Sequence, residues 1–206
     1  MKKILFDNQM FTLQRFGGVT RYFADLMYNL PKGEFVAEVP MRYCENHYVT
    51  KTYGQEYEKI TFPDNYRFRR QVYMLVNKHI AWKAIRFGNY DIFHPTYFNP
   101  YFLKSVKRSG KPFVLTVHDM TFERYPQDVL IYDRTIPHKK RLIAEADHII
   151  AVSENTKRDI IELLGTDPSK ISVVHHGYRP IAEPAPQLFD RYVLYVGERK
   201  GYKNFL

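Results

Sequence analysis

Residues 146–165 read ADHIIAVSENTKRDIIELLG and join a short apolar run to a helical pattern through one polar turn. We predict a buried strand over residues 148–152, since its apolar residues run consecutively. Ser153 is expected to cap a helix over residues 154–164, and Gly165 is expected to end it. Strand, polar turn and helix in this order form the repeating unit of parallel α/β sheets.

The same unit recurs along the chain. We predict further strands at residues 3–6, 35–39, 90–94, 113–117 and 171–174, and further helices at residues 19–30, 67–87 and 139–146. Residues 113–117 are rich in apolar and β-branched side chains, as expected for a strand buried on both faces of a parallel sheet. Residues 41–65 and 120–137 lack a clear period and are expected to form loops. The fold class is therefore α/β, with a Rossmann-like doubly wound parallel sheet of about six or seven strands.

A domain boundary is predicted near residue 178. Pro180, Pro184 and Pro186 follow closely upon one another, a composition typical of stiff interdomain connections. We therefore expect one domain over residues 1–178, a linker over residues 179–191 and the start of a second domain over residues 192–206. Residues 192–196 would be the first strand of that second domain, which is expected to be truncated.

The charge balance and the amino-acid composition limit the kinds of function that this chain can have. Thirty-one Lys and Arg residues oppose 22 Asp and Glu residues, giving a net charge of +9 that attracts phosphates, nucleic acid or an anionic bilayer. The single cysteine, Cys44, excludes an intramolecular disulfide, and no His or Cys spacing indicates a metal site. Neither a signal peptide nor an apolar stretch long enough to span a bilayer is found, so we expect a cytoplasmic protein.

A basic and aromatic segment lies at residues 66–86, where six Lys and Arg residues alternate with large apolar side chains. A solvated helix face explains this pattern. Contact with anionic lipid or a lipid-linked acceptor is the second, less favoured interpretation, and would place the protein at the inner face of the membrane. Nucleic-acid binding is not expected, because no recognised nucleic-acid-binding motif is present.

Candidate site residues follow the predicted strands, because ligands of open parallel sheets bind beyond the carboxyl ends of the strands. Gly17 and Gly18 precede a helix, where the backbone can approach a phosphate closely, although such a pair also serves ordinary turns. His118 and Asp119 end a central strand, where an imidazole can bind a sugar hydroxyl and a carboxylate can bind or deprotonate one. The remaining candidates at this edge are Asp7, His94 to Tyr97, Arg21, Ser153, and His175 to Gly177.

Taken in order, these pieces resemble family 4 glycosyltransferases of bacterial surface-polysaccharide and lipopolysaccharide synthesis. The resemblance rests on the Gly-Gly loop with its Arg-Tyr helix at residues 17–22, the strand end at residues 117–120, the run at residues 146–153, the strand and turn at residues 171–177, and Tyr195 to Gly197 with Arg199, Lys203 and Asn204. It covers nearly the whole chain.

The resemblance implies the amino-terminal, acceptor-binding half of a GT-B enzyme that retains anomeric configuration and needs no metal or other cofactor. It implies a UDP- or GDP-sugar as sugar donor and a glycan or lipid-linked acceptor. His118 and Asp119 would be catalytic, and Gly17, Gly18, Arg199 and Lys203 would bind the donor phosphates. Arg21, Tyr97 and Ser153 are expected to contact the acceptor.

The acidic motif that binds the nucleotide-sugar in this family is missing from residues 1–206, so the chain is expected to be inactive alone. A non-catalytic sugar- or nucleotide-binding module of the same fold is the alternative interpretation. Neither the transferred sugar nor the acceptor can be specified from these residues.

Overall fold

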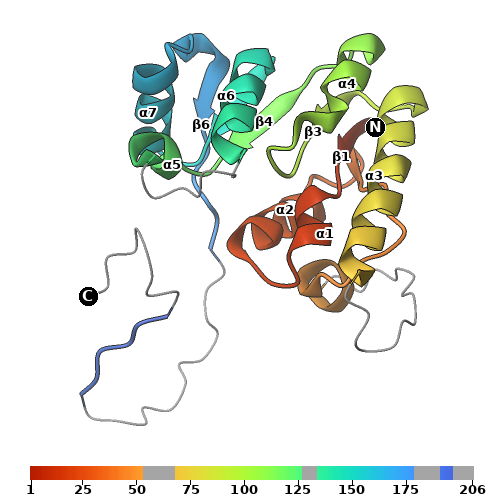
Figure 1. Ribbon diagram of the computed structural model, residues 1–206, viewed down its shortest axis with the longest axis horizontal. Helices are drawn as coiled ribbons and strands as arrows, with labels where there is room; N and C mark the ends of the chain where they lie inside the picture. The colour runs from red at the N-terminus through yellow and green to blue at the C-terminus, as the bar shows by residue number, and fades with distance from the viewer. Residues whose placement is uncertain (53–67, 127–133, 179–190, 197–206) are drawn as a thin grey trace.

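The computed structural model describes residues 1–52, 68–126, 134–178 and 191–196 (Figure 1). Within these residues all strand pairs are parallel, and the predicted Rossmann-like α/β architecture is confirmed. The strands are β1 (Lys2–Phe6), β2 (Phe35–Glu38), β3 (Ile92–His94), β4 (Val114–Val117), β5 (His148–Ala151) and β6 (Ile171–Val173).

The strands form two three-stranded sheets, ordered β2-β1-β3 and β4-β5-β6. A single parallel bridge between Phe93 and Phe113 joins β3 to the start of β4, and the Phe93 N–H donates to the Pro112 carbonyl over 2.9 Å. We call this junction the seam. β2 and β3 lie on opposite sides of β1, so the strand order reverses between β1 and β3. In open parallel sheets, ligands bind in the crevice at such a switch point.

The helices flank these sheets, with α6 and α7 beside the β4-β5-β6 sheet and α3 and α4 beside the other (Figure 1). Their bounds are α1 (Gln9–Leu13), α2 (Gly18–Tyr28), α3 (Arg69–Phe87), α4 (Leu103–Ser109), α5 (Thr121–Arg124), α6 (Thr135–Glu145) and α7 (Glu154–Leu164). Short helical turns cover Tyr48–Thr52, Pro100–Phe102 and Pro168–Lys170.

Three short helices depart from the sequence predictions. α5 lies where a loop was expected, and no helix was predicted at α1 or α4. With four to seven residues each, they are too short to show a helical period, and isolated helices of this length are unstable in water. Packing stabilises α1, whose Met10 and Phe11 are buried.

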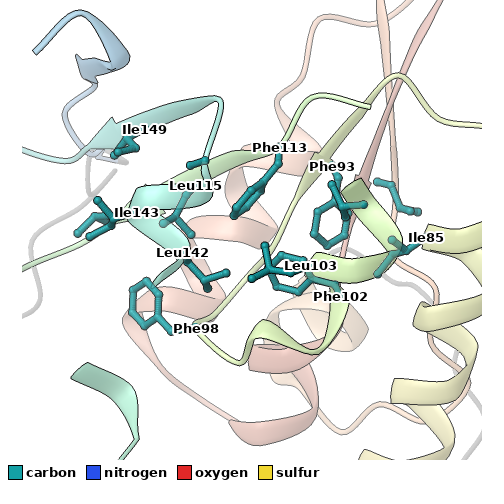
Figure 2. Close-up of a cluster of buried hydrophobic side chains, with 14 of the residues drawn as sticks. Ile85, Phe93, Phe98, Phe102, Leu103, Phe113, Leu115, Leu142, Ile143 and Ile149 are labelled. Carbon is teal, nitrogen blue, oxygen red and sulfur yellow. The ribbon is translucent and has the colours of Figure 1, made fainter. Parts of the chain in front are cut away.

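The main core crosses the seam. Phe93, Phe102 and Phe113 come from both sides of it, and the ring centroid of Phe102 lies 4.8 Å from that of Phe93 and 5.4 Å from that of Phe113 (Figure 2). Leu115 and Leu142 extend the same cluster. Apolar packing therefore joins the two sheets where backbone hydrogen bonds are sparse.

A second, smaller core lies between α2 and β1 and includes Phe6, Phe11, Phe23 and Cys44. Burial raises the pKa of the Cys44 thiol to about 11, so this cysteine stays protonated at neutral pH and behaves as a small apolar side chain. The core holds α2 against the carboxyl end of β1, which sets the position of the α2 amino terminus.

The predicted helix cap and stop around α7 are both confirmed. The Ser153 Oγ accepts a hydrogen bond from the Thr156 N–H at 3.1 Å, and Gly165 adopts φ +63°, a left-handed conformation that favours glycine.

The predicted strand at residues 192–196 does not form. Within the described residues 191–196 no strand is present, and Val193 is fully exposed. A strand is stable only beside a hydrogen-bonded partner. The predicted linker at residues 179–191 and the rest of the predicted second domain lie almost wholly outside the described residues.

Candidate functional site

Aromatic rings from three elements meet beyond the carboxyl ends of β4 and β6. The ring of Tyr22 on α2 lies perpendicular to that of His118, which follows β4, at 5.1 Å between centroids. It makes a similar contact with His176, which follows β6, also at 5.1 Å. The two imidazoles stack on each other with centroids 5.6 Å apart and 11° between their planes. We call Tyr22, His118 and His176 the ring cluster.

His118 occupies the inner position of this cluster. Burial and, to a smaller extent, the neighbouring His176 lower the pKa of its imidazole to about 4, so His118 is neutral at pH 7. Its Nε2 atom is buried and has no hydrogen-bond partner among the residues that the structure describes. A neutral imidazole in this state can donate a hydrogen bond to a ligand oxygen or accept one from a ligand hydroxyl.

Asp119 lies beside His118 but faces solvent. Its Oδ1 accepts a hydrogen bond from the Thr121 N–H at 3.1 Å, and its remaining acceptor capacity is open to a ligand. The carboxylate borders an open pocket of about 610 Å³ whose wall is largely polar. The other lining residues are Met120, Thr121, Arg124, Tyr125, Asn155, Thr156, Arg158, Asp159 and Glu162. We call this the α5–α7 pocket.

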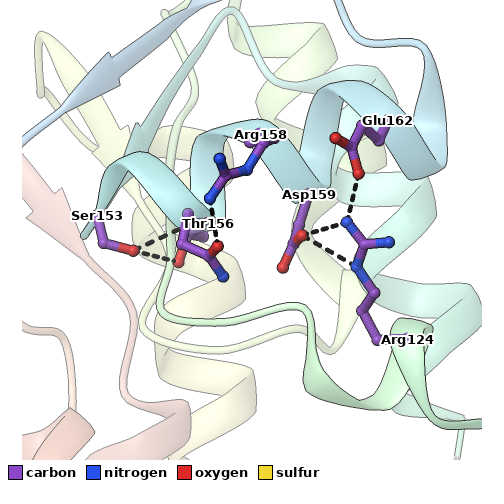
Figure 3. A network of polar contacts seen from close by, with 7 residues as sticks. Arg124, Ser153, Thr156, Arg158, Asp159 and Glu162 are labelled. Atoms are coloured by element: carbon purple, nitrogen blue, oxygen red, sulfur yellow. Dashed lines mark hydrogen bonds and ion pairs between the residues drawn. The ribbon is translucent and has the colours of Figure 1, made fainter.

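One wall of the α5–α7 pocket is a fixed ionic network (Figure 3). The Arg124 guanidinium donates to Asp159 Oδ1 from Nε at 3.0 Å and from Nη2 at 2.5 Å, and it also binds Glu162. Arg158 Nη2 donates to the Asn155 side chain at 2.7 Å. The pocket wall therefore carries charged groups that pair with one another.

Gly17 and Gly18 form the amino terminus of α2, one turn before Tyr22. Gly17 is extended, and its carbonyl accepts a hydrogen bond from the Thr20 hydroxyl at 2.9 Å. A Cβ atom added to Gly18 would meet nothing within 4 Å, so the space over this residue is open. The free N–H groups of a helix amino terminus carry roughly half a unit of positive charge, which favours an anion at this point.

Three other predicted site residues have structural partners. Arg21 is exposed and pairs with Asp25 on the same helix at 3.6 Å. Tyr97 packs its ring against Phe98 at 5.0 Å. Ser153 is engaged in the α7 cap. Arg199 and Lys203 lie outside the described residues.

Asp7 is a structural residue in this protein. It is completely buried, and its Oδ1 accepts hydrogen bonds from the Thr96 N–H at 2.8 Å and the Thr96 hydroxyl at 2.7 Å. Gln9 continues the connection, since its Oε1 accepts from the Asn99 N–H at 2.8 Å. These contacts join the end of β1 to the turn after β3, and they hold Tyr97 in place.

His94 is also internal. It is buried against Phe6, with its Nε2 2.9 Å from the Thr116 hydroxyl, and burial lowers the pKa of its imidazole to about 3. The Thr116 hydroxyl lies 3.4 Å from the Tyr22 hydroxyl as well. Thr116 therefore links a structural histidine to the ring cluster.

Sequence reasoning placed His176 at the same sheet edge as His118, but it predicted neither the ring contacts of Tyr22 and His176 with His118 nor the link through Thr116. Tyr22 stood in the quoted Arg-Tyr motif, and His176 at a strand end, but neither position reveals a ring contact. Among the described residues no group of three or more His, Cys, Asp or Glu side chains is placed to hold a metal ion. No helix in this part of the chain is long and apolar enough to cross a membrane.

Comparison with known protein families identifies the family of this chain. The sequence model of the family described as Glycosyltransferase Family 4 matches residues 16–180, a range that holds the amino terminus of α2, the ring cluster and the α5–α7 pocket. No curated protein matches the chain.

Proposed function

Because this chain belongs to glycosyltransferase family 4, we propose that it serves in the transfer of a sugar from a UDP- or GDP-sugar to a glycan or lipid-linked acceptor during cell-surface polysaccharide synthesis. The observation that carries the proposal is the state of His118. Its neutral ring and unpartnered Nε2 lie beyond the carboxyl end of a parallel strand, where such folds bind ligands.

In this proposal His118 binds the sugar that is transferred. A neutral imidazole forms a directional hydrogen bond to a sugar hydroxyl without adding charge near the reacting carbon. The contacts with Tyr22 and His176 leave the ring little freedom to turn away. A group held in this way stabilises the transition state without reorganising, which is the largest source of catalysis in many enzymes.

The acceptor would lie in the α5–α7 pocket. Asp119 borders it and is placed to accept a hydrogen bond from the attacking hydroxyl. Tyr125, 53% exposed, offers an aromatic face of the kind that sugars pack against. Arg21, Tyr97 and Ser153 are further proposed acceptor contacts, with Ser153 acting through the first turn of α7.

The donor diphosphate would lie at the amino terminus of α2. The open space over Gly18 supports this placement, because a phosphate can approach the backbone N–H groups there. Arg199 and Lys203 are proposed to neutralise the charge that develops on the leaving diphosphate. No metal is required in this scheme.

A membrane surface is the proposed location of the acceptor. Residues 68–87 contain no Asp or Glu, and the exposed face of α3 carries both basic and large apolar side chains. Leu75 and Phe87 are 69% and 71% exposed. Lys78 follows Leu75 by three positions and Lys83 precedes Phe87 by four, so each lysine lies about one helical turn from its apolar neighbour. Such a face binds anionic bilayers through charge and apolar insertion together, so we propose a cytoplasmic protein peripheral to the inner face of the membrane.

Release of nucleoside diphosphate by the full-length protein tests the activity. The protein would be incubated with a panel of UDP- and GDP-sugars, with and without a membrane-lipid extract as the acceptor source, and His118→Ala would serve as the control. Release that needs both the sugar nucleotide and His118 supports the proposal. Tight binding of a sugar nucleotide with no turnover under any condition would instead establish the non-catalytic binding module.

A further inference from the structure

Two consecutive carbonyl groups after β4 are held by side chains from two different helices. The Thr156 hydroxyl, in the first turn of α7, donates to the His118 carbonyl at 3.3 Å. The Lys139 ammonium, on α6, donates to the Asp119 carbonyl at 3.0 Å. These carbonyls belong to the peptide planes on either side of Asp119. Fixing both planes fixes the direction in which the Asp119 side chain leaves the backbone. The first of them, together with the Val117 carbonyl, which accepts from the Val152 N–H at 3.4 Å, does the same for His118.

Lys139 is itself held by a buried ion pair. Its side chain is 3% exposed, and its ammonium donates to Glu123 Oε2 at 2.9 Å, on a carboxylate that is 1% exposed. The same ammonium lies 5.2 Å from the centroid of the Phe98 ring. The second carboxylate oxygen, Glu123 Oε1, is buried without a hydrogen-bond partner among the described residues.

Stability alone does not explain why this buried ion pair is present. Burying two charges carries a large desolvation cost, and replacing such a pair with apolar residues of similar volume is often neutral or stabilising. An apolar pair could not supply a hydrogen-bond donor to the Asp119 carbonyl. The buried ammonium of Lys139, whose burial has a desolvation cost, therefore lies where it can donate a hydrogen bond to the turn that carries His118 and Asp119.

The Thr156 contact is equally well supported. Ser153 Oγ accepts from the Thr156 N–H at 3.1 Å and lies 3.0 Å from the Thr156 hydroxyl. With the Ser153 hydroxyl donating to Thr156 Oγ1, the Thr156 proton is directed to the His118 carbonyl. The α7 cap and the site turn are therefore one continuous hydrogen-bonded chain.

We propose that Lys139 and Thr156 are positioning residues for the turn that carries His118 and Asp119, and that Glu123 holds Lys139 in place. The effect on turnover rests on the proposed function. The positioning itself does not, because it acts on the imidazole of His118 whether or not a substrate is bound.

The test compares two double variants that both remove the buried charges. Lys139→Gln with Glu123→Gln keeps an N–H donor for the Asp119 carbonyl, whereas Lys139→Met with Glu123→Leu does not. Thr156→Ser and Thr156→Val form a second pair with the same contrast. Lys107→Met with Glu145→Leu removes a Lys–Glu pair that is 60% and 30% exposed, at the far end of α6, and is the control.

The readout is the His118 imidazole in long-range ¹H–¹⁵N spectra of the full-length protein, assigned with His118→Gln. We expect the Met/Leu and Val variants to move the His118 resonances and to broaden them. In the Lys139→Gln/Glu123→Gln, Thr156→Ser and control variants, the His118 resonances should stay close to those of the unmodified protein. Melting temperatures of the two double variants should agree within a few degrees.

Equal spectra for Met/Leu and Gln/Gln would overturn the proposal, because they would show that the donated hydrogen bond does not position the turn. If the resonances separate as expected and a sugar-transfer assay exists, kcat should fall roughly tenfold in Met/Leu with KM changed far less. If the resonances separate and no sugar nucleotide is turned over, the positioning stands and the proposed function fails.

Discussion

The imidazole of His176 is nearly parallel to that of His118, with 5.6 Å between their centroids, and the Tyr22 ring of α2 lies roughly perpendicular to both. Two imidazoles in this arrangement are compatible when at least one is neutral, because two cations at this distance repel each other. The stability of the stacked histidines therefore depends on pH. The buried His94 makes a further pH-dependent contribution to the stability of the fold. Acid stability is the first measurable consequence.

We predict that the free energy of unfolding falls as pH falls below about 6.5. His118 and His94 have pKa values of about 4 and about 3 in the folded chain, so between those values and the unfolded value the unfolded chain binds more protons. Each histidine should contribute a slope of about 1.4 kcal/mol per pH unit across its window. Asp7, whose pKa burial raises, gives a slope of opposite sign.

Urea unfolding of His94→Asn from pH 7 to pH 4 isolates one of these contributions, since the Asp7 effect is common to all variants. The variant should be less stable at pH 7 but lose less stability on acidification. His79→Asn, at an exposed position on α3, is the matched control and should follow the unmodified protein. Identical slopes for His94→Asn and the unmodified protein would show that His94 is protonated in the folded chain.

His118→Ala should lower kcat by roughly 10²-fold or more while the fold stays intact, because a contact made in the transition state is lost from turnover. A purely structural histidine would behave in the opposite way and cost about 1 to 3 kcal/mol of stability with little effect on turnover. Melting temperature and kcat are to be measured on the same preparation. A destabilised but fully active variant would remove His118 from the site.

Gly18→Ala should separate a binding role from a structural one. The added methyl group meets no neighbour, and alanine favours a helix over glycine, so the melting temperature should stay the same or rise. If the diphosphate lies at the amino terminus of α2, the same methyl group blocks its approach, and KM for the sugar nucleotide should rise at least tenfold. An unchanged KM in a stable Gly18→Ala variant would place the donor elsewhere.

Charge reversal on α3 tests the membrane surface. Lys78 and Lys83 are chosen because Arg69 pairs with Glu45 at 3.2 Å and Arg70 donates to the Leu13 carbonyl at 2.6 Å. The Lys78 ammonium lies 5.6 Å from the centroid of the Tyr101 ring, so the melting temperature of the variant is measured as well. Lys78→Glu with Lys83→Glu should weaken sedimentation with phosphatidylglycerol vesicles at low salt by roughly tenfold or more, since each basic residue contributes about 1 kcal/mol near an anionic surface.

Lys140→Glu with Arg141→Glu makes the same change of charge at exposed positions on α6 and is the control for this experiment. Equal loss of binding in the two double variants would mean that net charge alone attracts the vesicles. No loss in either would leave α3 as a solvated helix face.

How much the sequence predicts depends on how local each feature is. The Ser153 cap and the Gly165 stop of α7 were predictable because both are decided within one helical turn. The six described strands were predictable from their apolar runs. The helices α1, α4 and α5 were not, because tertiary packing stabilises elements of four to seven residues.

The site divides in the same way. Topology alone placed His118, Asp119 and Gly18 at one edge of the sheet. The contact of His176 with His118 joins residues 58 positions apart in sequence. The hydrogen bond from Lys139 to the Asp119 carbonyl spans 20 positions. Neither has a local pattern, and a buried lysine within a basic helical stretch looks like a surface residue.

The seam between β3 and β4 has a consequence for how the protein folds. Each three-stranded sheet has its own parallel ladder, whereas one bridge and a set of phenylalanine rings connect them. Amide hydrogen exchange should therefore reveal two cooperative units, with an opening along the seam that costs less than global unfolding. Tyr22 belongs to one unit, and His118 and His176 belong to the other. We therefore expect the ring cluster to form only when the two units dock, and to be lost when they separate.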